Sequence, residues 1–374
     1  MKETVSRFAR EVVAPKVKQM DEQEKFDDGV IKALFDSGLM GIEVSPDYGG
    51  SGSSFMSSIV AVEELARVDP CVSLAIDIQN TLSNTILTKY GTEEQRQKYL
   101  TRMATETFCS FCLSESTSGS DAFAMKTLAV PSSTSGAPEH WTLTGEKMWI
   151  SQAELADIFL VFAQTDPSKG YKGITCFIVE KGWGVQVGKK EKKLGMRASP
   201  TSTVTFDGLV VPNANVVGKV GEGYKIAIGL LNEGRIGIAA QMLGLAQGAF
   251  DVSMKYMLER KQFGKAIADF QGMQFQYAQL STELEAARLL TYNAGRMRDQ
   301  GLDFRMHASM AKLYTSQVAE KVASAAIEWM GGVGFTRDVP VEKFYRDCKV
   351  GKIYEGTSNI QLQGIAKMIA DKYK

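Results

Sequence analysis

The chain has 374 residues, enough for two or three domains of about 100–200 residues each. Its 44% hydrophobic and 23% charged residues are typical of a globular protein, and 43 basic residues balance 43 acidic ones. A net charge of zero argues against nucleic acid as a partner, and no apolar run reaches the ~18 residues of a membrane span. Five cysteines, sparse and odd in number, indicate a reducing compartment rather than a disulfide framework.

Residues 1–107 are predicted to form an N-terminal helical domain. Apolar residues recur at helical spacing from the first residues onward, as in Val5, Phe8 and Val12. No signal or transit pattern precedes them, so the sequence alone assigns no compartment. Further along, Thr92 to Gln95 has the spacing of a capping box that opens a helix.

Residues 108–215 are predicted to form a middle β domain, because the period changes at Phe108. Polar turns such as residues 131–138 separate the runs, with no alternation of strand and helix. Many short strands indicate a barrel or a sandwich, and we take the β-barrel as the prediction. The expected strands are Phe108–Leu113, Lys126–Val130, Trp141–Leu143, Ile158–Ala163, Ile174–Val179, Val185–Val187 and Thr201–Phe206.

Residues 216–374 are predicted to be helical again. Helices near 224–260, 270–299, 305–330 and 358–373 would make a C-terminal four-helix bundle, with a shorter helix near 341–350. The predicted fold is therefore mainly α with a central β domain.

The segment from Ile353 to Gln361 combines a carboxylate with a helix start. Gly356 follows Glu355 and permits close approach or a positive φ. Thr357, Ser358 and Asn359 then offer hydroxyls, an amide and free N–H groups, which suit an anion at a helix N-terminus. Glu355 is either a general base beside a cofactor or a solvated residue before an ordinary capped helix.

This segment resembles the catalytic-glutamate motif of the acyl-CoA dehydrogenases, and the likeness extends over essentially the whole chain. The short/branched-chain-specific members are closest, through residues 111–121, 170–175, 232–248 and 327–334. The resemblance implies FAD as cofactor, a short or 2-methyl-branched acyl-CoA as substrate and electron-transfer flavoprotein as electron acceptor. It also implies a homotetramer in the mitochondrial matrix, with Glu355 as catalytic base.

Hydroxyl-rich and aromatic residues are the candidates to contact the flavin. A strand that runs into a loop of hydroxyls can hydrogen-bond a heteroaromatic edge, although an ordinary strand-to-turn connection would look similar. Family members usually carry a glycine where this chain has Thr117. By resemblance the flavin contacts are Phe111, Cys112, Leu113, Ser114, Glu115, Ser116, Thr117, Ser118, Gly119, Ser120, Trp149, Ile150, Ser151, Thr357, Ser358 and Asn359.

A second set of cofactor residues is implied to reach the flavin dinucleotide of a neighbouring subunit. The basic cluster after residue 259 suits a pyrophosphate, with a solvated helix end as the alternative. The set comprises Arg260, Gln271, Glu328, Trp329, Met330, Gly331 and Gly332.

The substrate contacts implied by the resemblance are Ser120, Tyr171, Tyr224, Asn232, Glu233, Gly234 and Arg235. Gly234 stands where the isovaleryl- and long-chain-specific relatives carry their base, which favours Glu355 for that role here. Arg235 either meets a CoA phosphate or stabilises its helix locally. No metal site is expected, because the chain has two histidines and no second cysteine pair beside Cys109 and Cys112.

Three alternatives to this function stay open on the sequence. One is an isobutyryl- or straight short-chain-specific enzyme of the same family. The second is an acyl-CoA oxidase, whose members usually carry a further C-terminal domain. The third is a non-enzymatic scaffold on the same fold.

Overall fold

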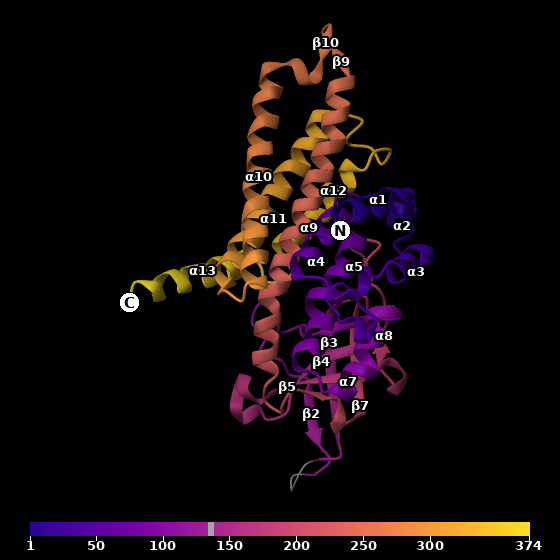
Figure 1. The fold of residues 1–374 in the computed structure, drawn as a ribbon, viewed down its shortest axis with the longest axis vertical. Helices are drawn as coiled ribbons and strands as arrows, with labels where there is room; N and C mark the ends of the chain where they lie inside the picture. The colour runs from indigo at the N-terminus through magenta and orange to yellow at the C-terminus, as the bar shows by residue number, and fades with distance from the viewer. Residues whose placement is uncertain (134–137) are drawn as a thin grey trace.

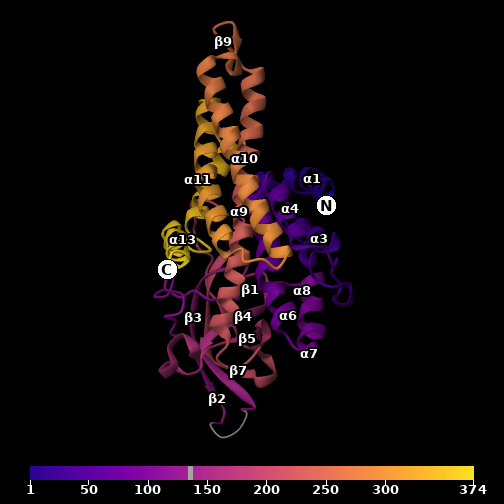
Figure 2. The ribbon, with the colours of Figure 1, turned by 60° about the vertical axis from the view of Figure 1, so that its left-hand side comes forward.

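The structure is a computed structural model that describes residues 1–133 and 138–374. A block of helices from the N-terminal part packs beside a sheet and beside three long helices from the C-terminal part (Figures 1 and 2). The sheet lies at one end of the elongated molecule, and the long helices extend to the other end. The turn predicted at residues 131–138 falls partly outside the described residues.

The N-terminal block is built from short helices whose starts are capped by side chains. Asp27, Ser54 and Asp69 accept hydrogen bonds from backbone N–H groups at three starts, and the capping box at Thr92 and Gln95 is confirmed. A π-helical segment, Ile78–Asn84, joins α5 to α6. The helices are α1 (Lys2–Phe8), α2 (Val17–Gln23), α3 (Asp28–Asp36), α4 (Phe55–Ala66), α5 (Pro70–Asp77), α6 (Thr85–Tyr90), α7 (Glu93–Gln95) and α8 (Thr101–Thr105).

The middle part forms one open sheet. Its strands are β1 (Phe108–Cys112), β2 (Leu128–Pro131), β3 (His140–Ser151), β4 (Ala156–Gln164), β5 (Ile174–Glu180), β6 (Gln186–Val187), β7 (Thr201–Pro212) and β8 (Val216–Val217). The order is β6-β7-β3-β2-β4-β5-β8, with β1 paired parallel to β4. Within the described residues no pairing joins β6 to β8, so the predicted closed barrel is not confirmed.

The C-terminal part contains α9 (Gly223–Glu259), α10 (Gln271–Asp299), α11 (Arg305–Met330), α12 (Val341–Cys348) and α13 (Ser358–Lys372). The first three run side by side, and a hairpin of β9 (Lys261–Gln262) and β10 (Lys265–Ala266) lies at their far end (Figures 1 and 2). The predicted four-helix bundle is not confirmed. Helix α13 contacts α11 and then extends away from the three long helices (Figure 1), so part of its apolar face stays exposed.

A buried ion network ties the blocks together. Lys343 on α12 lies 2.7 Å from Asp69, the cap of α5, and 2.6 Å from Asp347. Asp347 also accepts a hydrogen bond from the backbone N–H of Met196 in the middle part. No helix in the described residues is long and apolar enough to cross a bilayer.

Candidate active site

Glu355 lies in a short turn between α12 and α13. Its backbone is left-handed, with a φ of 51°, and that of Gly356 follows with a φ of 87°. Thr357 caps α13, because its hydroxyl accepts a hydrogen bond from the N–H of Ile360. The preceding Tyr354 hydroxyl donates to the side chain of Gln241 on α9. Both flanks of the turn are therefore anchored, and the Glu355 side chain is directed at α9.

The carboxylate of Glu355 is buried beside Gly234. A Cβ added at Gly234 would lie 2.8 Å from Oε2 of Glu355 and 3.1 Å from Leu82, so the glycine leaves room there. Oε2 has no hydrogen-bond partner among the described residues. Burial raises the pKa of Glu355 to about 7, although the positive charges of Arg235 and Lys312 oppose this. A carboxylate with a pKa near neutral can act as a general base at physiological pH.

The hydroxyl-rich loop after β1 is anchored by a buried ion pair. Lys147 on β3 is fully buried, 2.9 Å from Glu115, and it also donates to the carbonyl of Leu113. Glu115 further accepts from the N–H groups of Lys126 and Thr127. Burial alone would raise the pKa of Glu115, but Lys147 and these hydrogen bonds lower it. The loop is thus fixed at Glu115, while Ser116, Thr117, Gly119 and Ser120 are exposed and Cys112, Leu113 and Ser118 are buried.

Trp149 is an exposed aromatic residue in an unusual backbone conformation. Its φ is 63°, its side chain is 54% exposed, and the pairing of β3 with β7 shifts register between Lys147 and Ile150. Ile150 is buried, and the carbonyl of Ser151 accepts from the hydroxyl of Ser110 on β1. The N–H of Met148 donates to the carbonyl of Ser114. The indole of Trp149 therefore belongs to the part of β3 that hydrogen-bonds the loop after β1. Together they fit a flavin, which needs a flat apolar surface beside hydrogen-bonding groups.

Aromatic rings gather where α9 begins. The rings of Tyr171 and Tyr224 lie 4.5 Å apart, and that of Phe123 lies 4.4 Å from Tyr224. Phe123 follows Ser120 in the chain, so the structure brings the segments of Ser120, Tyr171 and Tyr224 together. Phe111 of β1 packs against the same apolar cluster as Phe123.

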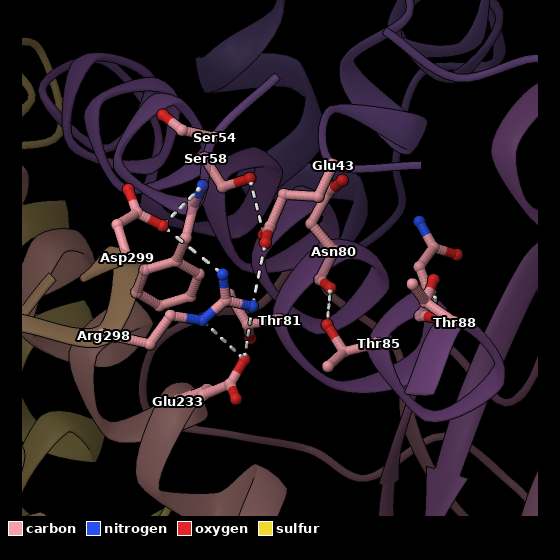
Figure 3. Close-up of polar contacts among 12 residues, drawn as sticks. Glu43, Ser54, Ser58, Asn80, Thr81, Thr85, Thr88, Glu233, Arg298 and Asp299 are labelled. Atoms are coloured by element: carbon pink, nitrogen blue, oxygen red, sulfur yellow. Dashed lines mark hydrogen bonds and ion pairs between the residues drawn. The ribbon is translucent and has the colours of Figure 1, made fainter. Parts of the chain in front are cut away.

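The side chains on either side of Gly234 on α9 point to different partners. Glu233 forms an ion pair with Lys89. It also pairs with Arg298 at 2.9 Å (Figure 3). Arg298 also contacts Glu43 and Asp299 in this network, which borders a polar cavity of about 230 Å³. Ion pairs thus occupy the side chain of Glu233, and its role as a substrate contact stays a prediction.

Arg235 is directed into the protein, where it donates to Asn232 at 2.9 Å and to Ser309 at 3.2 Å. Its charge acts on the carboxylate of Glu355. Of the two roles expected for Arg235, these contacts favour the local one over binding a CoA phosphate.

Four residues near Glu355 have no signal in the sequence. Asp77 on α5 is buried, and a Cβ added at Gly237 of α9 would collide with its carboxyl at 1.9 Å. Burial and the charge of Glu355 raise the pKa of Asp77 well above its usual value. Leu82 borders Glu355 near Gly234, and Lys312 and Gln361 hydrogen-bond the Glu355 turn. Asp77, Leu82 and Lys312 come from segments far from Glu355 in sequence. Gln361 lies only six residues after Glu355 and looks like an ordinary polar helix residue, so only the fold reveals its contacts with the turn.

The second set of predicted cofactor residues lies at the far end of the long helices. From Lys312 to Trp329, α11 rises by about 25 Å. Arg260 and Gln271 are exposed near the terminal hairpin. Trp329 is instead buried against Met257 and Ala268, and its indole N–H donates to Gln276. These residues are not brought to Glu355 of the same chain.

One buried group has the ligand types of a metal site. Ligand atoms of Asp69, Cys71 and Asp347 lie within 4.8 Å of one another. The ammonium of Lys343 hydrogen-bonds both carboxylates, so the cluster is a salt-bridge network.

Comparison with known proteins places this arrangement in a family. Models of the acyl-CoA dehydrogenase N-terminal, middle and C-terminal domains match residues 1–107, 110–209 and 221–370. The chain belongs to the acyl-CoA dehydrogenase family. It is therefore an oxidoreductase that acts on a CH–CH bond of an acyl-CoA, with FAD as its cofactor.

Among individual relatives, the chain is 58% identical to a probable short/branched chain specific acyl-CoA dehydrogenase of Dictyostelium discoideum, over the whole chain and 90% of the relative. It is 56% identical to the mitochondrial short/branched chain specific acyl-CoA dehydrogenase of Rattus norvegicus, over the whole chain and 85% of the relative.

Solved structures are similar as well. Butyryl-CoA dehydrogenase of Megasphaera elsdenii has a TM-score of 0.95 at 37% identity, covering 99% of this chain and 97% of its own. A glutaryl-CoA dehydrogenase of Mycobacterium smegmatis in complex with FADH2 has a TM-score of 0.92 at 29% identity, covering 99% and 93%.

Proposed function

We propose that the chain oxidises short or 2-methyl-branched acyl-CoA to trans-2-enoyl-CoA and passes the electrons to electron-transfer flavoprotein, in fatty-acid and branched-chain amino-acid breakdown. Relatives at 56–58% identity named for short/branched-chain substrates support this choice. The observation that carries it is the buried, unpartnered carboxylate of Glu355 beside Gly234.

Glu355 is the general base in this proposal. It removes the α-proton of the thioester, and a pKa of about 7 leaves it largely ionised above neutral pH. The backbone N–H of Glu355 has no acceptor in the described part of the chain, so it is free to hydrogen-bond the thioester oxygen and stabilise negative charge there. FAD, when bound, supplies the acceptor for the hydride that leaves the β-carbon.

The chain's own residues hold the reactants. Residues 111–120, 149–151 and 357–359 would hold the flavin, and the exposed indole of Trp149 would offer its ring a flat apolar surface. Ser120, Tyr171 and Tyr224 bind the thioester ligand where α9 begins. Gly234 leaves room for the acyl chain beside Glu355.

The site is completed by a second copy of the chain in a homotetramer. The second set of cofactor residues lies far from Glu355 of its own chain, because α11 rises by about 25 Å from Lys312 to Trp329. This set comprises Arg260, Gln271 and Glu328 to Gly332. The outer faces of the helices support association, because Phe275 on α10 is 66% exposed and Leu362 on α13 is 52% exposed. We further infer domain limits at residues 107/108 and 215/216, and a mitochondrial location as in the relatives from rat and cow.

Absorption spectroscopy of the purified protein tests the proposal. We expect a flavin spectrum that bleaches on addition of 2-methylbutanoyl-CoA, and bleaching is lost in Glu355→Gln, which keeps its flavin. Faster bleaching by isobutyryl-CoA or butanoyl-CoA would assign the enzyme to those substrates instead. Peroxide formation without a protein electron acceptor would identify an oxidase, and a colourless protein would contradict the proposal.

A further inference from the structure

The backbone that carries Glu355 is held in a conformation that most residues avoid. Glu355 and Gly356 are both left-handed, and for a residue with a Cβ this region is disfavoured by steric clash. Such a conformation persists only where the surroundings enforce it. The direction of the Glu355 side chain therefore depends on the groups that hold this turn.

Two buried side chains hold the carbonyl groups of the turn. Nε2 of Gln361 on α13 donates to the carbonyl of Glu355 at 3.0 Å and to that of Gly356 at 2.9 Å. Nζ of Lys312 on α11 donates to the carbonyl of Gly356 at 2.6 Å. A Cβ at Gly356 would lie 2.7 Å from Nε2 of Gln361, so the glycine is what allows this close approach.

Lys312 differs from the other buried lysines of the chain. Lys147 and Lys343 each lie against carboxylates within 3 Å. Lys312 is 1% exposed, yet no carboxylate of the described residues forms an ion pair with it, and its one hydrogen bond is to the Gly356 carbonyl. Burial lowers its pKa to about 8, and the charge of Glu355 opposes this decrease. The negative group that compensates its ammonium is therefore the carboxylate of Glu355.

The other ionisable groups around Glu355 do not replace Lys312. Arg235 on α9 adds a positive charge, which stays at all accessible pH values. Asp77 on α5 is buried and Tyr354 in the same turn is partly buried, and desolvation raises the pKa of both, which disfavours a second negative charge beside Glu355. Lys312 is thus the one partner in the described surroundings that both holds the turn and carries a charge.

We propose that Lys312 and Gln361 are positioning residues for Glu355: together they fix the turn that directs its carboxylate at Gly234, and Lys312 also supplies the positive charge that favours the ionised base. This inference rests on the proposed role of Glu355 as the base. The two residues have different roles. Gln361 contributes hydrogen bonds alone, whereas Lys312 contributes a hydrogen bond and a positive charge.

The test compares Lys312→Met and Gln361→Met as FAD-loaded enzymes, by measuring kcat and KM for butanoyl-CoA from pH 6 to 10. For Lys312→Met we expect the acidic limb of the kcat profile to move up by about one pH unit, because the base loses a stabilising charge. Its kcat at pH 7 should fall roughly tenfold or more with little change in KM. For Gln361→Met we expect a lower kcat with the acidic limb unmoved, since no charge is removed.

Lys321→Met is the matched control, because Lys321 lies on the same helix and pairs with Glu283 at the surface. It should have the wild-type profile. A wild-type profile and kcat in Lys312→Met would overturn the inference, and so would an equal shift in both buried variants. If Lys312→Met does not fold, Lys312→Gln keeps a donor without the charge and should show the shifted limb. Turnover by Glu355→Gln would instead refute the proposed function, so the two failures are distinguishable.

Discussion

At the scale of single residues, Glu355 works in surroundings that disfavour its charge. Its pKa is raised from 4.5 to about 7 by burial, so the folded protein binds a proton there more tightly than the unfolded chain. Folding stability is therefore lost progressively as the pH rises from about 4.5 to about 7, and the loss is complete above that.

Glu355→Gln removes this cost and should make the FAD-loaded protein more stable. At pH 8 we expect an increase in the free energy of unfolding on the order of 1–3 kcal/mol, shrinking toward zero near pH 5. Urea unfolding of both proteins at the two pH values measures it. An increase that does not depend on pH would show that the charge of Glu355 is not its cause.

Gly234→Ala tests the space beside the carboxylate. The added Cβ would lie 2.8 Å from Oε2 of Glu355, so the side chain must move away from the acyl chain. We expect kcat to fall by about tenfold or more, while alanine gains up to ~1 kcal/mol in helix propensity over glycine. Steady-state kinetics and thermal unfolding give the two values.

The matched control for this change is Gly229→Ala on the same helix, where the added Cβ meets only the Tyr90 hydroxyl at 3.4 Å. Its kcat should stay near that of the wild type. Full activity in Gly234→Ala would place the reacting carboxylate elsewhere.

Glu355 was predictable because its neighbours in sequence carry the motif. The residues that control it were not. Lys312 occupies a helical position that sequence alone interprets as a surface lysine, and Gln361 follows the helix cap like any polar residue. Their significance lies in the hydrogen bonds that they donate to the turn from α11 and α13. Lys312 is 44 positions from its acceptor Gly356, and Gln361 is six positions from Glu355. Periodicity does not encode such contacts.

At the scale of elements, the long helices and most strands follow from the sequence, whereas β3 and β7 are longer than predicted. Predicted as residues 141–143 and 201–206, they span His140–Ser151 and Thr201–Pro212. Lys147 and Gly145 interrupt the apolar alternation of β3 and so favour a turn in the sequence pattern. In the structure Lys147 is buried against Glu115, which removes the conflict.

Lys147→Met should loosen the loop after β1. Removing one partner of a buried ion pair leaves Glu115 uncompensated, which typically costs 3–5 kcal/mol. The N–H groups of Lys126 and Thr127 still satisfy part of the carboxylate, so we expect about 2–3 kcal/mol together with weaker FAD binding. Chemical denaturation and flavin release during gel filtration measure the two effects.

Lys126→Met is the control for that change, because only its backbone N–H contacts Glu115. Its stability and flavin content should match the wild type. Unchanged flavin retention in Lys147→Met would separate this ion pair from the cofactor loop.

At the scale of the whole molecule, the candidate residues of one chain fall into two groups that lie far apart. Trp149 belongs to β3 in the sheet at one end of the molecule, whereas Arg260 immediately precedes the β9–β10 hairpin, which lies at the opposite tip (Figure 1). Helix α13 leaves the bundle with apolar residues uncovered, which a second copy would bury. Helix and strand patterns predict where elements lie along the chain but not how they pack. The sequence therefore could not establish whether the helices form a four-helix bundle or whether the sheet closes into a barrel.

If Arg260 serves the site of a second copy, two inactive variants should restore each other. Glu355→Gln lacks the base and Arg260→Met lacks the pyrophosphate contact, so each alone should have little activity. In a mixed pair, one of the two sites combines an intact Glu355 from one chain with an intact Arg260 from the other. Co-expression with two different affinity tags should therefore yield mixed oligomers with about half of the wild-type activity per pair. The measurement is kcat per flavin after tandem purification. Mixed oligomers as inactive as their parents would show that Arg260 acts within its own chain or away from the cofactor.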